Sequence, residues 1–309
     1  MPRGGFAMSV LVTGASGYIG GSIAHALLAS GHAVVGLVRS EVRAAQVRER
    51  GMEPLIGTLD DPDLLAAAAR AADAVINAAN AEHPGVVGAI LSALAGSGKP
   101  FLQTSGSSIV ADLAAGEPSD QVYDEDTPVH ALPGRAARVA LNDAVLAAAR
   151  NGVRAVVICP SLIYGAGRGA NARSIQVPWL IDLARKHGVP KHIGRGENIW
   201  SNVHVDDLVD LYLLALDRSP GGAFYYVENG ESSMRAACQA IGRMLGLGER
   251  TEPMTLAEAA AEWGEGAANY TMGSNSRVRA VRARRELGWT PHRPSLRHDI
   301  EHGSYKEAS

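Results

Sequence analysis

Short apolar runs alternate with longer segments of helical spacing in the first half of the chain. The apolar runs predict buried strands at residues 10–13, 32–38, 54–57, 74–79, 100–104 and 153–159. Helices are predicted between them at residues 22–30, 41–50, 63–72, 86–97 and 135–151. Because strands that alternate with helices pair in parallel, the pattern predicts an α/β fold with a doubly wound parallel sheet.

The second half of the chain has a looser pattern. It predicts helices at residues 177–188, 208–217, 234–245 and 256–265, and one further strand at residues 223–227. The irregular segment 111–133 is long, which indicates either a loop that serves a site or disorder. Residues 277–287 are strongly basic, a composition typical of a solvated helix face.

A glycine turn joins the first predicted strand to the first helix. Gly14 allows the sharp turn, Gly17 leaves room for a pyrophosphate, and Gly20 lets the helix lie close to the sheet. The free N–H groups at the start of that helix then face the phosphates. The turn also contributes Ser16, Tyr18 and Ile19 to the expected site. A glycine pattern between a strand and a helix predicts dinucleotide binding.

The end of the second strand bears on which dinucleotide binds. An acidic residue there would hold the ribose 2′-hydroxyl of NAD and repel a 2′-phosphate. The chain has Arg39 and Ser40 instead, a cation and a hydroxyl that suit a phosphate. We therefore favour NADP(H) over NAD(H), with a solvated Arg39 at a strand end as the alternative.

Further cofactor contacts are expected after the third and fourth strands. Leu59 and Asp60 follow the third strand, and Asp60 is expected near the adenine, although Asp60 or Asp61 could instead cap the next helix. Ala78 and Ala79 are small enough to let the cofactor pass. Either Asn77 or Asn80 is expected to bond the backbone or the cofactor, since both lie where the chain should be buried.

The fifth strand ends in a turn rich in hydroxyl groups, residues 104–108. Thr104 and Ser107 lie in this turn, at the carboxyl edge of a parallel sheet, where ligands bind in such folds. Serines are also common in turns without any ligand, so a substrate role and a purely structural one both stay open.

Composition narrows the class of protein. The chain has 309 residues, is 46% hydrophobic and 20% charged, and carries a net charge of −3, which argues against nucleic-acid binding. No apolar stretch reaches the roughly 18 residues of a membrane span, and residues 1–8 lack the apolar run of a signal peptide. Two cysteines cannot form a disulfide framework, and Cys159 is expected in the core. We expect a cytoplasmic protein without a metal site.

Several motifs together resemble one family. They are residues 13–20 (TGASGYIG), Gly57-x-Leu59-Asp60, residues 74–79, Thr104-Ser105, Pro160-x-x-Ile163-Tyr164-Gly165, residues 203–207 and Glu286-Leu-Gly-Trp289-x-Pro291. Over residues 9–300 the chain resembles the extended short-chain dehydrogenase/reductase family, often labelled NAD-dependent epimerase/dehydratase. The resemblance implies a Rossmann-type core over residues 9–160. It also implies a mostly substrate-binding lobe over residues 161–309, with residues 200–230 returning to the core.

The catalytic pattern of that family is altered in this chain. The family has Tyr-x-x-x-Lys, in which the tyrosine transfers a proton and the lysine holds the nicotinamide ribose. Gly134 falls at the tyrosine position, Arg138 at the lysine position and Gly106 at that of the active-site serine, with Ser107 beside it. The chain is therefore similar to atypical members that keep the cofactor fold and lose the usual triad.

Other groups would have to supply the missing chemistry. Arg138 is permanently charged, so it can hold ribose hydroxyls or stabilise negative charge but cannot act as an acid. His130 has a suitable intrinsic pKa for proton transfer, and Tyr164 lies in the family loop that lines the nicotinamide. Tyr123 and His204 are weaker candidates. Pro160 and Ile163 of the same loop are expected to contact the cofactor.

Two function classes stay open. The first is an NADP(H)-dependent reductase or dehydrogenase of a small carbonyl, imine or activated alkene. The second is a cofactor-binding regulator without catalysis, and a sugar-nucleotide enzyme is a weaker third. The family precedent suggests a homodimer through the alanine-rich helices at residues 86–97 and 135–151.

Overall fold

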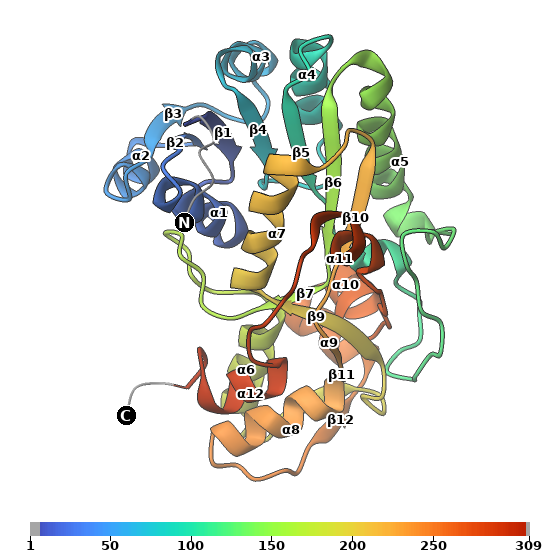
Figure 1. The fold of residues 1–309 in the computed structure, drawn as a ribbon. Helices are drawn as coiled ribbons and strands as arrows, with labels where there is room; N and C mark the ends of the chain where they lie inside the picture. The colour runs from blue at the N-terminus through green and yellow to red at the C-terminus, as the bar shows by residue number, and fades with distance from the viewer. Residues whose placement is uncertain (1–6, 307–309) are drawn as a thin grey trace.

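A sheet of seven parallel strands forms the centre of the molecule (Figure 1). The structure, a computed structural model, describes residues 7–306. The strand order is β10-β6-β5-β4-β1-β2-β3. The strands are β1 (Ser9–Thr13), β2 (Ala33–Val38), β3 (Glu53–Ile56), β4 (Ala74–Asn77), β5 (Pro100–Thr104), β6 (Arg154–Pro160) and β10 (Ala223–Val227). This confirms the predicted α/β fold with a doubly wound parallel sheet.

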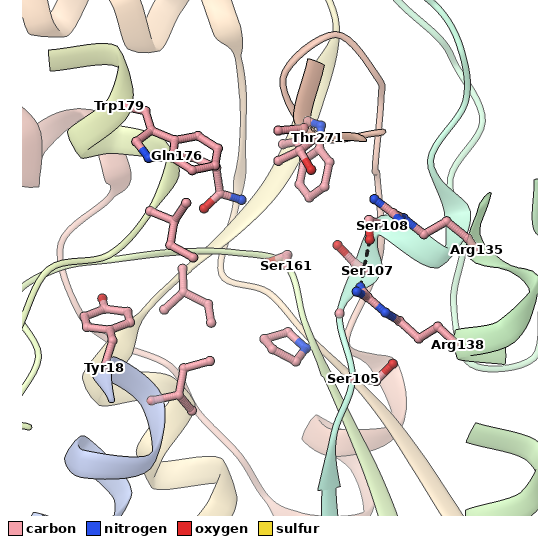
Figure 2. Close-up of a pocket in the computed structure, with 17 residues that line it drawn as sticks. Tyr18, Ser105, Ser107, Ser108, Arg135, Arg138, Ser161, Gln176, Trp179 and Thr271 are labelled. Atoms are coloured by element: carbon pink, nitrogen blue, oxygen red, sulfur yellow. Dashed lines mark hydrogen bonds between the residues drawn. The ribbon is translucent and has the colours of Figure 1, made fainter. Parts of the chain in front are cut away.

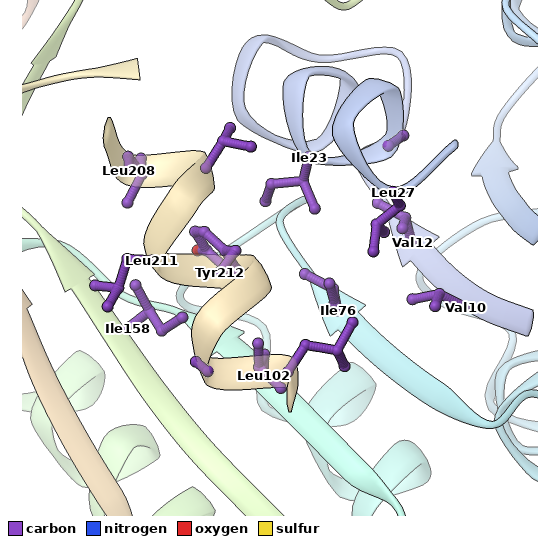
Figure 3. Close-up of a cluster of buried hydrophobic side chains, with 14 of the residues drawn as sticks. Val10, Val12, Ile23, Leu27, Ile76, Leu102, Ile158, Leu208, Leu211 and Tyr212 are labelled. Carbon is purple, nitrogen blue, oxygen red and sulfur yellow. The ribbon is translucent and has the colours of Figure 1, made fainter. Parts of the chain in front are cut away.

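Helices cover both faces of the sheet because the strand side chains alternate between the two faces. Val10 and Val12 of β1 pack with α1 (Tyr18–Ala29), α2 (Glu41–Arg48) and α7 (Val205–Arg218), as Figure 3 shows for α1 and α7. Leu11, between those two valines, packs on the opposite face. The helices of that face are α3 (Pro62–Ala71), α4 (Pro84–Leu94) and α5 (Pro133–Ala147).

A smaller lobe follows the sheet and has its own apolar core. Its helices are α6 (Gln176–His187), α8 (Met234–Met244), α9 (Leu256–Trp263), α10 (Glu265–Ala267) and α12 (Leu296–His302). Two small sheets accompany them, with strand orders β11-β9-β7 and β12-β8. Their strands are β7 (Leu162–Tyr164), β8 (Lys191–Ile193), β9 (Ile199–His204), β11 (Glu231–Ser233) and β12 (Glu252–Met254). The sequence pattern predicted none of these five strands. Four of them have only three residues each, and all five depend on partners far along the chain.

Two segments of the chain differ from the sequence expectation. The segment 111–133 is tied down at Tyr123, which forms a β-bridge to Val278. The basic run 277–287 is a solvated helix face only in part. Helix α11 (Val281–Leu287) exposes Arg284 and Arg285, whereas Arg277 and Arg279 precede it, and several arginines of the run pair with acidic groups. Those pairs are Arg277 and Arg279 with Glu231, Arg282 with Asp126, and Arg284 with Glu228. No helix among the described residues is both long and apolar enough to cross a membrane.

Polar side chains inside the sheet satisfy one another. The Thr13 hydroxyl donates to the Asn77 side-chain oxygen, and the Asn77 amide donates to Gln103 Oε1 at 2.8 Å. Asn77 therefore bonds side chains of neighbouring strands rather than the backbone or a cofactor. This network fixes the strand ends from which the site is built.

Arg154 of β6 holds the carboxyl end of α7. Its guanidinium donates to the carbonyl oxygens of Ala215 (3.3 Å), Leu216 (2.6 Å) and Ser219 (3.1 Å). The Ala215 oxygen also accepts from the Ser219 N–H at 3.1 Å. The last carbonyls of a helix otherwise lack partners within it, so a cation there satisfies them and complements the helix dipole. Burial lowers the pKa of Arg154 from its usual value, which does not discharge a group of this basicity.

We expect Arg154→Met to lower the free energy of unfolding by about 2 kcal/mol, because hydrogen bonds to a charged donor are lost. Urea unfolding followed by circular dichroism measures the change. Arg150→Met, an exposed arginine just after α5, is the matched control and should unfold as the parent does. Equal midpoints for both variants would contradict the role given to Arg154.

Candidate active site

A cavity of about 460 Å³ lies beside the glycine turn and is called here the glycine cavity. It is lined by Gly14, Ser16, Gly17, Leu37, Val38, Arg39, Arg43, Gly57, Leu59, Ala78, Ala79, Asn80 and Asn171. Seven of these are cofactor residues expected from the sequence, namely Gly14, Ser16, Gly17, Arg39, Leu59, Ala78 and Ala79. The structure brings them together from four different strand ends.

Two positions of the turn require glycine because other backbone atoms lie too close for a side chain. Gly14 has φ of +71°, and a Cβ there would lie 2.7 Å from the carbonyl oxygen of Ala78. A Cβ on Gly20 would overlap the carbonyl oxygen of Gly14. The absence of both Cβ atoms seats α1 directly on the end of β1, with its first N–H groups at the cavity. Such a cradle fits the pyrophosphate of a dinucleotide.

A second cavity, of about 320 Å³, lies next to the glycine cavity. Gly17 lines the glycine cavity, and the following residue, Tyr18, lines the second one. We call it the arginine cavity (Figure 2). Its lining includes the predicted residues Tyr18, Ile19, Ser107, Arg138, Pro160 and Ile163. The other lining residues are Ser105, Gly106, Ser108, Arg135, Ser161, Ile175, Gln176, Trp179, Trp200, Ala267 and Thr271.

Two arginines from α5 form the charged wall of the arginine cavity. Arg138 donates to Ser108 Oγ at 2.9 Å and pairs with Glu82 Oε1 at 2.7 Å, while Arg135 lies 3.9 Å from the same Glu82 oxygen. Figure 2 shows both side chains projecting from α5 toward the serine turn. The Nε atoms of Arg135 and Arg138 and the Ser105 hydroxyl are buried without a partner among the described residues. The Ser105 hydroxyl lies next to the Cys159 thiol, so the two Nε atoms are the unsatisfied donors of this wall.

The opposite wall is apolar and aromatic, and includes Ile163, Ile175, Trp179 and Trp200. Tyr18 belongs to this wall, and its hydroxyl donates to the carbonyl oxygen of Gly165 at 2.8 Å. Burial raises the pKa of Tyr18 far above its usual value. A phenol that is engaged in this way and hard to ionise is a poor proton donor.

Four residues expected at the cofactor lie outside both cavities. Gly20 sits behind the turn, and Ser40 caps α2 by accepting a hydrogen bond from the Arg43 N–H. Asp60 lies 3.0 Å from His83 Nε2, while Asp61 is the residue that caps α3. Thr104 shares a hydrogen bond of 2.6 Å with the Tyr212 hydroxyl.

Two residues expected to transfer protons also lie outside the arginine cavity. Tyr164 is buried, donates to the carbonyl oxygen of Pro294 at 2.6 Å, and has a pKa raised by burial. His130 is exposed in the long segment before α5. His204 caps α7 by accepting from the Asp206 N–H at 3.1 Å, so it anchors the start of that helix. Cys159 lies in the core, where burial raises its pKa to about 12.

Several lining residues have no signal in the sequence. Gln176, Trp179 and Thr271 come from the smaller lobe, and only the fold places them beside the serine turn. Arg135 and Arg43 have a weak signal. Arg135 lies one helical turn from Arg138, and Arg43 lies one turn into the helix that follows Arg39.

Residues 10–226 match the model of the NAD dependent epimerase/dehydratase family. The chain belongs to this family. It is 33% identical over 340 residues to oxidase ucsJ of Acremonium sp, across 97% of each chain. It is 31% identical over 318 residues to a ketoreductase of Stigmatella aurantiaca, covering 91% of this chain and 92% of the relative. That relative is named for 4-hydroxy-2-methyl-3-oxo-4-farnesyl-3,4-dihydroquinoline-1-oxide.

A solved member of the same architecture is dTDP-glucose 4,6-dehydratase from Bacillus anthracis in complex with NAD. Its TM-score is 0.77 at 16% identity, over 96% of this chain and 95% of that one. The expected family and Rossmann-type fold are therefore confirmed. The family and its reductase and oxidase relatives identify the chain as an NAD(P)-dependent enzyme of the oxidoreductase type.

We expect Gly17→Val to abolish NAD(P)H binding, because the new side chain would enter the glycine cavity where a pyrophosphate fits. Gly17 has φ of −83°, a value that any residue can adopt. The substitution therefore tests whether the cavity has room for the ligand, without straining the backbone dihedral. Calorimetric titration with the cofactor measures the loss. Gly88→Val, on exposed helix surface with no atoms within 4 Å of the new Cβ, is the control. Parent-like affinity in Gly17→Val would contradict the phosphate site.

Proposed function

We propose that the protein is an NADP(H)-dependent reductase of small organic molecules with a flat, apolar body and a carbonyl, imine or activated alkene. The arginine cavity carries this proposal. It joins a wall of isoleucine and tryptophan side chains to two arginines and four serines, directly beside the cofactor turn. Such a pocket suits a planar apolar ligand with one polar, reducible end.

Two cations at the glycine cavity support NADP(H) as the cofactor. Arg39 and Arg43 both line this cavity, where a 2′-phosphate on the adenosine ribose would lie within reach of guanidinium groups. Asp60 lies 3.0 Å from His83 Nε2 and is not among the residues that line this cavity. When bound, NADPH would supply a hydride to the substrate.

The chain's own residues would hold the reacting groups. We propose that Arg138 binds the nicotinamide ribose and stabilises negative charge on the substrate oxygen, helped by Ser107. Pro160, Ile163 and Ile19 provide an apolar surface for the nicotinamide ring. Tyr164 and His130 receive no role, because both lie away from the cavity.

The wall of the arginine cavity favours a reductase over a sugar-nucleotide enzyme. A nucleotide diphosphate needs several cations and polar groups around it, whereas the wall opposite Arg135 and Arg138 is apolar and aromatic. The ketoreductase relative acts, by its name, on a bicyclic aromatic compound, which agrees with an apolar wall.

We propose that the protein works in the cytoplasm as a homodimer. The buried free thiols of Cys159 and Cys238 suit a reducing compartment. The exposed residues of α5 are mostly small, among them Ala136, Ala140 and Ala144, which permits close packing between helices.

The test of the function is NADPH consumption with a panel of acceptors, followed by absorbance. We expect turnover with aryl ketones, diketones or quinones and none with UDP-sugars. Cofactor binding without oxidation by any acceptor would favour the regulator instead. Turnover of UDP-sugars alone would favour the sugar-nucleotide enzyme.

We expect Arg39→Ala to lower the affinity for NADPH about ten- to a hundredfold and the affinity for NADH much less. The reason is that a charge-assisted hydrogen bond to a phosphate contributes about 1.5–3 kcal/mol. Calorimetric titration of both cofactors measures the difference. Arg48→Ala, an exposed arginine of α2 outside the cavity, is the control. Equal losses for the two cofactors, or a parent that prefers NADH, would refute the NADP(H) assignment.

A further inference from the structure

The described residues that line the arginine cavity include no free acid suited to proton transfer. The guanidinium groups stay charged, the serine and threonine hydroxyls are very weak acids, and the Tyr18 phenol is committed to Gly165. Reduction of a carbonyl nevertheless requires a proton at its oxygen. A group next to the lining must therefore deliver it.

Tyr270 is not itself a lining residue, but it is next to one in the chain, Thr271, and it packs against another, Arg135. It lies in the single π-helical turn Ala268–Met272, and the cavity is lined by Ala267 before this turn and by Thr271 after Tyr270. The guanidinium carbon of Arg135 sits 4.5 Å from the centre of the Tyr270 ring. A cation over an aromatic face fixes the ring, and it also places positive charge close to the phenol oxygen.

Gly134 provides the space that the Tyr270 hydroxyl fills. A Cβ on Gly134 would lie 2.6 Å from Tyr270 Oη and 2.7 Å from its Cζ. Gly134 and Arg138 are four residues apart in α5, so they share the helix face from which Arg138 reaches the cavity. The glycine therefore leaves the phenol oxygen on the same side of α5 as the two arginines.

We propose that Tyr270 is the proton donor of this enzyme, a catalytic role that rests on the proposed reductase function. As the substrate carbon takes the hydride, the electron pair of its C=O bond moves to oxygen, and that oxygen takes the proton of Tyr270 Oη. The phenolate that remains lies beside the guanidinium group of Arg135, and it regains a proton from water. The smaller lobe thus supplies the proton donor, Tyr270, and α5 supplies the positive charge that stabilises the phenolate.

The first test is reduction of benzil, an aryl diketone, by the Tyr270→Phe enzyme. We expect kcat to fall by about 10²–10⁴-fold while the KM for NADPH stays unchanged, since only the proton transfer is lost. Tyr123→Phe removes a hydroxyl from a second half-buried tyrosine outside the cavity and should behave as the parent. An unchanged kcat in Tyr270→Phe would overturn the proposal.

A double-mutant cycle tests the packing against Gly134. Gly134→Ala should lower kcat by displacing the phenol, yet alanine suits a helix and leaves the fold intact. In the Tyr270→Phe enzyme, Gly134→Ala should lower kcat only slightly further, because the hydroxyl that it would displace is already absent. Gly88→Ala is the control on exposed helix surface. Fully additive losses would contradict a shared site.

A third readout needs no turnover. Nitration by tetranitromethane, mapped by mass spectrometry of peptides, should modify Tyr270 in the free protein and be suppressed when NADP⁺ and benzoin fill the cavities. Tyr123 should react equally in both states. Unprotected Tyr270 would overturn its role even in an active reductase. Absence of NADPH oxidation with every acceptor would instead refute the reductase itself, and the proton donor with it.

Discussion

The closeness of α1 to the ends of β1 and β4 is the constraint on which the rest of the structure depends. Neither Gly14 nor Gly20 could carry a Cβ without meeting backbone of the turn or of the segment after β4. This contact fixes the first N–H groups of α1, and with them the border between the two cavities. The same turn also positions one side of the arginine cavity, because Tyr18 and Ile19 at the start of α1 line it.

The two sides of the site have different origins. The glycine cavity is lined largely by strand ends and turns of the central sheet, whose network of Thr13, Asn77 and Gln103 leaves little freedom. The arginine cavity is closed by the smaller lobe, through Trp179 and Thr271. A rigid cofactor cradle beside a variable substrate wall agrees with a family whose members act on different compounds.

Sequence reasoning was strongest where the signal is local. Continuous apolar runs located the strands of the central sheet, and the spacing to Gly134 drew attention to Arg138, which lines the arginine cavity. Sequence reasoning was weakest for side chains whose hydrogen-bond partners lie far along the chain. Thr104 and Tyr164 looked available for a ligand, yet their hydroxyls bond Tyr212 and Pro294. Tyr270 belongs to no motif, and only the tertiary fold brings it to α5.

The ring of Tyr270 packs against Arg135 and Gly134, so it joins the smaller lobe to α5. A hinge motion that parted the lobe from α5 would separate the phenol from the guanidinium group of Arg135. Lobe closure and assembly of the acid with its counter-charge are then the same event. Solvent that enters an open cleft would meet an incomplete site, which protects a bound hydride donor from wasteful reaction before the substrate is enclosed.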